Sequence, residues 1–414
     1  MPNYNANNSK KASRNNASSQ PITVNSAGTV VAVPLPRGAE ACSPANPFPA
    51  VAFPPAIPVA NVVAPTTRKL LPSSVAQLKS QGYTNGLIES ISNNTNAFPH
   101  RIWVVDNSGS MTTPDGHRLL QTSDNFVKAY DCTRWSEIQD TVSYHARVAT
   151  LLEAPTSFRL LNPTLGMREF GVAERPDHIQ EDLAYVLHHM RGISPSGVTP
   201  LTKRVTEISA YIQSIKNDLV SKGQKTVIVL ATDGLPSDRF GESSQRTMKE
   251  FQQALQSMEG LPIWLVIRLC TDDEEVVNFY NNIDSHLEMS CDVLDDFFAE
   301  ALEVYEHNNW LNYALPLHRM REMGFYHKLF DLIDERSLTK DELKDFFLLI
   351  YGADALDGIP DPQLDWDRFI DRIAVVTSEE KLQYNPVRKR MMPWVDIKRL
   401  GRKYGGASAL CKFF

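Results

Sequence analysis

Three stretches of the chain are almost wholly apolar and too short for buried helices: 102–105, 226–231 and 263–269. A strand without a polar face is typical of the centre of a parallel sheet, because helices cover such a sheet on both sides. Between these strands the apolar residues recur every three or four positions, which is the period of an amphipathic helix. The most regular case has apolar residues at positions 201, 205, 208, 212, 215 and 219. The pattern therefore predicts alternating strands and helices.

The weaker signals between residues 98 and 308 continue the same alternation. Shorter strands are expected over 157–161, 167–172 and 289–293. Helices are expected over 133–153, 178–190, 243–258, 273–283 and 294–308. Strand–helix alternation with short links predicts an α/β fold, a doubly wound and mostly parallel sheet of the Rossmann-like kind. The alternating segments 117–121 and 126–132 predict a β-hairpin inserted into this order.

Composition divides the chain into four regions. Residues 1–68 are rich first in Asn and Ser and then in Pro and Ala, so we expect a disordered arm. Residues 69–97 predict a short helical segment that packs on the α/β region, residues 98–308. Residues 309–414 are expected to be α-helical and to end in a basic tail. Their predicted helices cover 318–334, 339–351 and 365–375.

The overall composition is that of an ordinary globular protein. Of the 414 residues, 42% are hydrophobic and 22% are charged, and the net charge is −7. No apolar run reaches the roughly 18 residues of a membrane helix, so we expect no membrane span. The N-terminus shows no signal-peptide pattern, and the five cysteines are an odd number without a C-x-x-C pair. These features favour reduced thiols in a cytoplasmic protein, with the nucleus as the alternative.

Polar side chains follow two of the apolar strands and begin one of the helices. Asp106 ends the first strand, and Ser108 and Ser110 follow it at alternate positions. Asp233 ends the strand at 226–231, and Thr199 precedes the most regular helix. In doubly wound sheets the corresponding loops open onto one edge, where such folds bind ligands. Two carboxylates and three hydroxyls suit Mg²⁺, which takes about six oxygen ligands.

Pro200 fits the first position of that regular helix, and Thr199 fits the capping position before it. The sequence therefore predicts that Thr199 stands at a helix start, facing the same edge as the two acids. An α/β domain whose loop acids merely cap helices remains the plain alternative.

Three segments together resemble the metal-ion-dependent adhesion site of a von Willebrand factor type A domain. They are Asp106-Asn107-Ser108-Gly109-Ser110, Gly197-Val198-Thr199-Pro200-Leu201 and Thr232-Asp233-Gly234. Their identity, order and approximate spacing match that family, and the resemblance covers residues 98–308, about half of the chain.

The resemblance implies a role for each of these residues. Ser108 and Ser110 would coordinate the metal directly, Thr199 directly or through water, and Asp106 and Asp233 directly or through waters. It implies Mg²⁺, with Mn²⁺ or Ca²⁺ as alternatives, and an open position that takes a carboxylate from a partner protein. We therefore expect an intracellular protein-binding module, acting as an adaptor or scaffold, and not an enzyme.

The hairpin at 117–132 departs from the family pattern, and we expect it to form a specificity wall beside the metal. A haloacid-dehalogenase-like phosphatase is the enzymatic alternative, because there too an Asp ends the first strand. That chemistry requires a second acid two residues later to protonate the leaving group, and this chain has Ser108 there. A scaffold whose basic tail, residues 388–403, contacts acidic lipid or nucleic acid is the third reading.

Overall fold

The structure is a computed structural model, and it describes residues 69–121, 127–164, 166–284, 287–289 and 291–405. These residues belong to one compact unit that spans residues 63–414. The predicted disordered arm, residues 1–68, lies outside the described residues.

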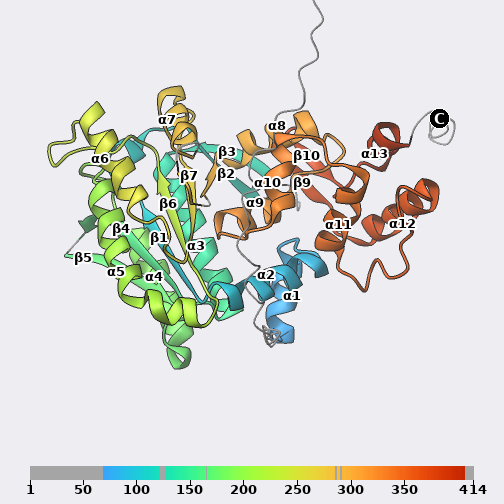
Figure 1. Cartoon of the computed structure of the whole chain (residues 1–414), viewed down its shortest axis with the longest axis horizontal. Coiled ribbons are helices and arrows are strands. Elements are labelled where there is room, and N and C mark those ends of the chain that lie inside the picture. Colours follow the sequence, from blue (N-terminus) through green and yellow to red (C-terminus); the bar gives the residue numbers. More distant parts are fainter. Residues whose placement is uncertain (1–68, 122–126, 165, 285–286, 290, 406–414) are drawn as a thin grey trace, which may run out of the picture. The chain divides into compact units, whose positions relative to one another are not determined.

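A six-stranded sheet forms the centre of the α/β region (Figure 1). Its strands lie in the order β5 (Met167–Val172), β4 (Thr156–Thr164), β1 (His100–Val105), β6 (Thr226–Thr232), β7 (Ile263–Leu269) and β8 (Cys291–Leu294). Neighbouring strands are parallel except β4 and β5, which are antiparallel. The prediction of an α/β fold with a mostly parallel sheet is confirmed.

The register of the sheet brings the ends of its central strands level. Val105 of β1 lies opposite Ala231 of β6, and Ala231 lies opposite Arg268 of β7. Because these strands are parallel, the loops that follow them leave the sheet side by side at one edge.

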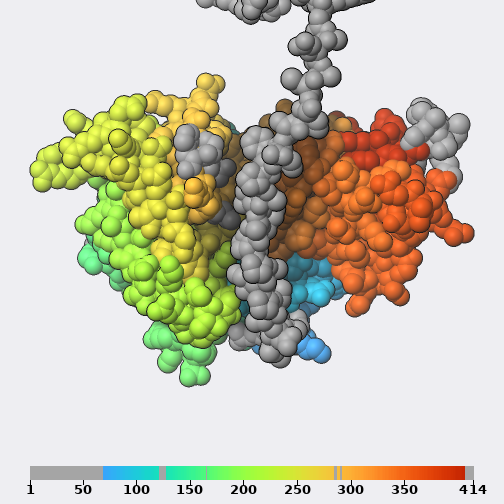
Figure 2. Space-filling view, viewed as in Figure 1, coloured from blue at the N-terminus to red at the C-terminus, as the bar shows by residue number. Residues whose placement is uncertain are grey.

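Helices cover both faces of the sheet, which is why its central strands have no polar face. The helices on one face are α3 (Arg134–Leu152) and α4 (Ile179–Gly192), and those on the other are α5 (Leu201–Ser221), α6 (Gln245–Gln256) and α7 (Glu274–Asp284). Along β1, Trp103 and Val105 belong to the first apolar layer, whereas Ile102 and Val104 belong to the second. In the space-filling view, the yellow-green and yellow part of the chain, which includes α5 and α6, forms the surface on the left (Figure 2).

The predicted helical segment before the sheet is a pair of helices, α1 (Pro72–Ser80) and α2 (Asn85–Ala97). The hydroxyl of Thr84 caps α2 by accepting a hydrogen bond from the N–H of Leu87. α2 packs on α11 (Lys340–Tyr351) so closely that a Cβ on Gly86 would lie 2.4 Å from the backbone nitrogen of Gly352. The segment therefore joins the α/β region to the C-terminal helices.

The predicted hairpin is present as β2 (Gly116–Gln121) and β3 (Val127–Cys132), two antiparallel strands that form their own sheet. The N–H of His117 donates to the Glu137 carboxylate of α3 at 2.8 Å. The ring of His117 lies 5.4 Å from that of Phe298 in α8 (Phe297–His307). The hairpin thus packs against both α3 and α8.

The C-terminal region is helical, as predicted, but its division differs. Its elements are α9 (Leu315–Glu322), α10 (Lys328–Glu335), α11, α12 (Trp366–Glu379), β9 (Gln383–Asn385), β10 (Arg390–Met392) and α13 (Ile397–Tyr404). The single helix predicted over 318–334 is wrong, because Gly324 separates α9 from α10 with a φ of +79°. Glycine adopts this left-handed conformation without steric cost, and it commonly ends helices. Neither α13 nor the antiparallel pair of β9 and β10 was predicted.

The basic tail packs on the chain's own surface. Arg388 and Arg399 each donate to the hydroxyl of Tyr305 in α8 at 2.6 Å, and Lys403 donates to Ser337 at 2.6 Å. These contacts hold α13 against the end of α8. In the part of the chain that the structure describes, no helix is long and apolar enough to cross a membrane.

Candidate metal centre

Asp106 is held in place where β1 ends. One oxygen of its carboxylate accepts a hydrogen bond from the N–H of Ser108 at 2.8 Å, and the other accepts one from the hydroxyl of Thr232 at 2.6 Å. Its own N–H donates to the carbonyl of Ala231 at 2.9 Å. Because Asp106 is fully buried, the sheet and these donors fix its position.

A chain of contacts runs from this loop to the second predicted acid. The hydroxyls of Ser108 and Ser110 lie 3.0 Å apart, and Ser110 donates to the Asp233 carboxylate at 2.9 Å. A short 3-10 turn over Gly109–Thr112 turns the two serines toward each other. Four of the five predicted residues therefore meet at the carboxyl edge of the sheet.

Thr199 lies beside this group on a third loop. Its N–H donates to the hydroxyl of Ser237 at 2.9 Å, and its carbonyl accepts from the N–H of Ser237 at 2.9 Å. A Cβ placed on Gly234, next to Asp233, would lie 3.9 Å from the Thr199 hydroxyl. The N–H of Gly109 also donates to the carbonyl of Gly197 at 3.2 Å. All five predicted residues thus gather at one place.

The predicted capping role of Thr199 is wrong. α5 begins at Leu201, so Pro200 occupies the capping position, and no side chain caps its first turn. The physical reason is that the backbone of Thr199 is bonded to Ser237 in the loop after β6. Thr199 therefore belongs to the loop that contacts Ser237 and not to the helix.

Asn107 and Asn162 support these loops, although sequence reasoning did not single them out. Asn107 donates to the carbonyl of Asn162 at 2.9 Å and accepts from the N–H of Asn162 at 2.8 Å. The side chain of Asn162 in turn donates to the carbonyl of Val198 at 2.7 Å. A Cβ on Gly197, which has a φ of +95°, would lie 2.7 Å from that side chain. Only glycine fits this close approach, so β4 ties the first and third loops together.

Arg134 is the main site residue that sequence reasoning missed. One terminal nitrogen of its guanidinium donates to the Asp233 carboxylate at 3.0 Å. The Nε and the other terminal nitrogen donate to the two oxygens of Asp115 at 2.7 and 2.6 Å. Arg134 is the first residue of α3, directly after the capping Thr133. A cation at the start of the first long helix was the available signal.

The electrostatics of the two acids favour a bound cation. Burial and the nearby Asp233 raise the pKa of Asp106 to about 6. Burial also raises the pKa of Asp233, although the hydrogen bonds from Arg134 and Ser110 oppose it. Two buried carboxylates are costly unless positive charge compensates them, and Arg134 supplies a single charge that it shares with Asp115. Carboxylate and hydroxyl oxygens that lie this close together are the donor set that Mg²⁺ prefers, so the residues fit the ion.

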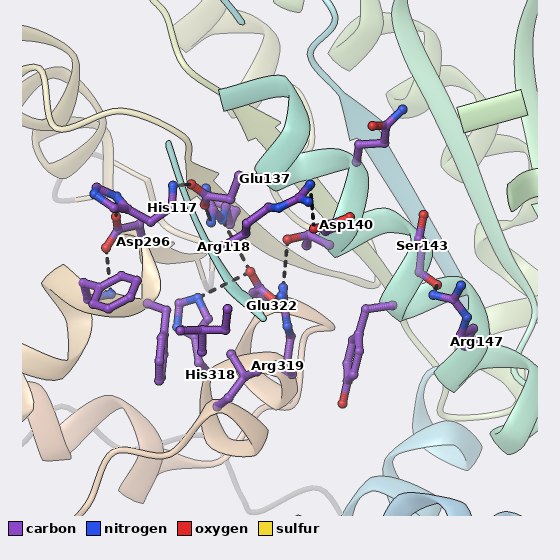
Figure 3. A pocket seen from close by; sticks show the side chains of 18 of the residues that line it. His117, Arg118, Glu137, Asp140, Ser143, Arg147, Asp296, His318, Arg319 and Glu322 are labelled. Atoms are coloured by element: carbon purple, nitrogen blue, oxygen red, sulfur yellow. Dashed lines mark hydrogen bonds and ion pairs between the residues drawn. The ribbon is translucent and has the colours of Figure 1, made fainter. Parts of the chain in front are cut away.

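A polar pocket of about 350 Å³ lies where the hairpin meets α3 and α9 (Figure 3). His117 of the hairpin lines it together with Arg319 and Glu322 of α9. Strand β2 lines this pocket, and Asp115 at the base of the hairpin reaches Asp233 through Arg134. None of the five predicted metal ligands lines the pocket, so the specificity wall beside the metal stays a prediction.

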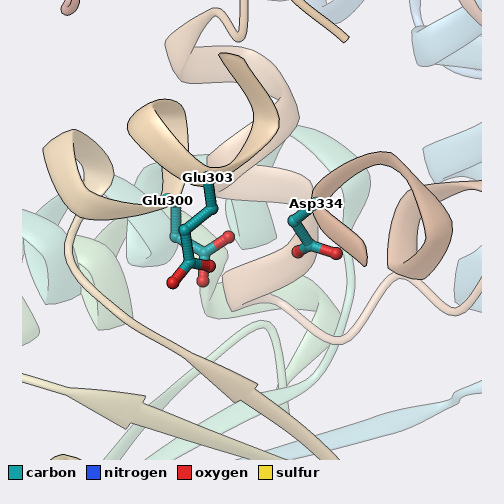
Figure 4. A group of neighbouring side chains, drawn as sticks. All are labelled: Glu300, Glu303 and Asp334. Carbon is teal, nitrogen blue, oxygen red and sulfur yellow. The ribbon is translucent and has the colours of Figure 1, made fainter. Parts of the chain in front are cut away.

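A second acidic cluster, which the sequence did not predict, lies between α8 and α10. Oxygen atoms of Glu300, Glu303 and Asp334 all lie within 4.8 Å of one another (Figure 4). By residue type this cluster suits a metal ion. Arg321, however, lies 2.6 Å from Glu300 and 2.8 Å from Asp334, so a guanidinium already supplies positive charge there.

Comparisons with known proteins do not identify a family. No family model matches the chain, and no curated protein matches it. Among solved structures, the chain is similar to a mutant of the PilB minor pilin from Streptococcus sanguinis, with 13% identity and a TM-score of 0.33. The match covers 48% of this chain and 57% of that chain. A similarity this weak carries no argument about the fold or the function.

Proposed function

We propose that the α/β region of this chain is a von Willebrand factor type A domain and that the protein is an intracellular, non-enzymatic adaptor. In this proposal it binds a partner protein through Mg²⁺, with Mn²⁺ or Ca²⁺ as alternative ions. The residues that hold the ion are Asp106, Ser108, Ser110, Thr199 and Asp233. When bound, the ion supplies positive charge and an open coordination position for a carboxylate of the partner.

The observation that carries this proposal is the unbroken contact from Asp106 through Ser108 and Ser110 to Asp233. Ser110 and Asp233 are 123 positions apart in the chain, yet they share a hydrogen bond. The contact lies at the carboxyl edge of a mostly parallel sheet, where such folds bind ligands.

The five residues contribute negative charge, hydroxyl oxygens and a third enclosing loop to the proposed site. Asp106 and Asp233 supply the negative charges that attract a divalent cation. Ser108 and Ser110 supply hydroxyl oxygens that already face each other. The loop of Thr199 closes a third side, because Ser237 holds its backbone on both the N–H and the carbonyl.

Binding is a better proposal than phosphoryl-group hydrolysis for this arrangement. A phosphatase of the haloacid-dehalogenase type requires an acid two residues after the first Asp, as a proton donor. Ser108 occupies that position, and its hydroxyl contacts Ser110. A serine hydroxyl at its ordinary pKa does not protonate a leaving group, so the site suits coordination instead.

Affinity capture from cell extract, with Mg²⁺ and with EDTA, tests the proposal when mass spectrometry reads the captured proteins. We expect at least one partner to be lost in EDTA and also with Asp106→Ala in the presence of Mg²⁺. Asp218→Ala is the matched control, because Asp218 is exposed near the opposite end of α5 and pairs with Lys222.

Near-ultraviolet circular dichroism verifies that the Asp106→Ala variant keeps its fold. Identical partner lists in Mg²⁺ and EDTA contradict the proposal. Hydrolysis of p-nitrophenyl phosphate by the purified protein, lost in Asp106→Asn, favours the phosphatase instead.

A further inference from the structure

We propose that Arg134 determines ligand specificity at this site, because its guanidinium gives the partner's carboxylate a second anchor beside the metal. The inference rests on the proposed function and adds a residue that the three resembling segments do not contain.

Arg134 is held rigidly at the edge of the site. Its N–H donates to the carbonyl of Thr113 at 3.0 Å, which fixes the start of α3 against the first loop. Asp115 holds the guanidinium by two hydrogen bonds, and Asp233 holds it by a third. Only 12% of the Arg134 side chain is exposed. A guanidinium fixed in this way loses little conformational entropy when it binds a ligand.

The guanidinium still has donors to offer. It carries five N–H groups, and the bonds to Asp115 and Asp233 use three of them. Among the contacts of the described residues, two N–H groups on the terminal nitrogens therefore remain for an incoming acceptor.

The position of Arg134 places these donors beside the proposed metal ligands. One oxygen of Asp233 accepts from Ser110, and its other oxygen accepts from Arg134. Ser110 and Asp115 are exposed, so a ligand can approach the site on this side. A group that reaches the ion past Ser110 therefore passes the guanidinium.

A carboxylate is the ligand that this pair of cations fits. Its two oxygens are equivalent, so one can bind the ion while the other accepts from the planar guanidinium. An alcohol or a backbone carbonyl offers a single oxygen and gains nothing from Arg134. The structure thus favours a partner that presents a Glu or Asp side chain or a chain terminus.

Binding of Mn²⁺ and then of acetate to the purified full chain tests the inference without an identified partner. Water-proton relaxation measures the affinity for Mn²⁺ and the displacement of its bound water by acetate, at constant ionic strength. We expect Arg134→Gln to weaken acetate binding about tenfold while the affinity for Mn²⁺ stays equal or rises. Loss of one positive charge near the ion explains why Mn²⁺ binding does not weaken.

Two further variants test whether the planar guanidinium and its fixed position are both needed for acetate binding. Arg134→Lys retains the charge without the planar fork, so it is expected to restore part of the acetate affinity. Asp115→Asn weakens the hydrogen bonds that hold the Arg134 guanidinium in place. It is therefore expected to weaken acetate binding by a smaller factor than Arg134→Gln does. Arg147→Gln is the matched control, because Arg147 lies on the same helix and bonds only to the Ser143 carbonyl among the contacts described.

The outcomes separate this inference from the proposed function. Equal acetate affinity in wild type and Arg134→Gln, with Mn²⁺ bound to both, overturns the role of Arg134 and leaves the metal site standing. A rise in Mn²⁺ affinity without any change for acetate makes Arg134 a mere counter-ion for Asp233, which also overturns it. Absence of Mn²⁺ binding to the wild type overturns the proposed function itself.

Discussion

Asp106 is fully buried, and burial together with the nearby Asp233 raises its pKa to about 6. Hydrogen bonds from Thr232 and Ser108 lower that pKa, but they do not outweigh burial. A carboxyl group with a raised pKa binds its proton more tightly in the folded chain than in the unfolded chain. At the scale of this residue, protonation therefore favours folding, whereas a bound cation favours the ionised form.

We expect the unfolding free energy of the metal-free protein to fall as the pH rises from about 4, the ordinary pKa of Asp, to about 6. Over this range the folded Asp106 keeps a proton that the unfolded chain has already released, so the loss occurs with rising pH. Asp106 contributes on the order of 2 kcal/mol to this change. Urea unfolding in EDTA at several pH values measures it.

Other carboxyl groups titrate in the same range, so Asp106→Asn serves as the reference for this measurement. Asparagine does not ionise, and the variant is expected to lose less stability over the same pH interval. An equal pH dependence in both proteins contradicts the raised pKa. In the wild type the affinity for Mg²⁺ should rise as the pH passes about 6, because the ion and the proton compete for Asp106.

At the scale of elements, Glu322 joins α9 to the helix that carries Arg134. Its buried carboxylate lies 2.7 Å from Arg319 of α9, 3.0 Å from His145 of α3 and 3.4 Å from Arg268 of β7. Burial by itself raises the pKa of Glu322, but Arg319, His318 and His145 outweigh it and hold that pKa well below its usual range. Glu322 is therefore ionised, and it fixes three elements at the pocket in Figure 3.

We expect Glu322→Gln to lower the unfolding free energy by about 3 kcal/mol, because it removes the carboxylate that pairs with the partly buried Arg319 and leaves the buried Arg268 with Glu137 alone. Urea unfolding at neutral pH measures the change. Glu379→Gln is the matched control at an exposed position on α12, and it should stay within about 0.5 kcal/mol of wild type. If both variants change the unfolding free energy by a similarly small amount, the Glu322 contacts contribute little to stability.

At the scale of the whole described chain, the α/β region and the C-terminal helices share one apolar core. Leu152 of α3 and Val304 of α8 belong to the same buried cluster as Trp310 and Phe347. Gly324 lies so close to β6 that a Cβ on it would be 2.3 Å from the Val227 side chain. The boundary expected near residue 308 therefore falls inside a continuous packed unit.

We expect a fragment of residues 98–308 to be much less stable than residues 63–414. The fragment exposes the apolar faces of α3 and α8, and it leaves Arg268 without Glu322. Exposed apolar faces favour aggregation. Size-exclusion chromatography and thermal unfolding compare the two. A monomeric fragment that unfolds at the same temperature as the longer chain shows instead that the C-terminal helices are dispensable.

Much of the α/β region, and the gathering of the five predicted residues at one edge of its sheet, could be anticipated because the signals are local. Each strand that ends on Asp106 or Asp233 is an apolar run followed by an acid, and the order of such runs implies a parallel sheet. The break at Gly324 was missed because glycine also occurs inside helical patterns, and only its φ reveals a helix end. The capping role predicted for Thr199 was wrong because Ser237, in the loop after β6, binds its backbone.

The sequence by itself determined which strands end on an acid and which hydroxyl side chains follow them, because apolar periodicity and the chemistry of neighbours along the chain decide both. The tertiary structure alone decided that Arg134 meets Asp233, that Glu322 meets His145 and that one core joins the two regions. The first pair is 99 positions apart and the second is 177. Contacts over such separations depend on how whole elements pack, and no local pattern carries that information.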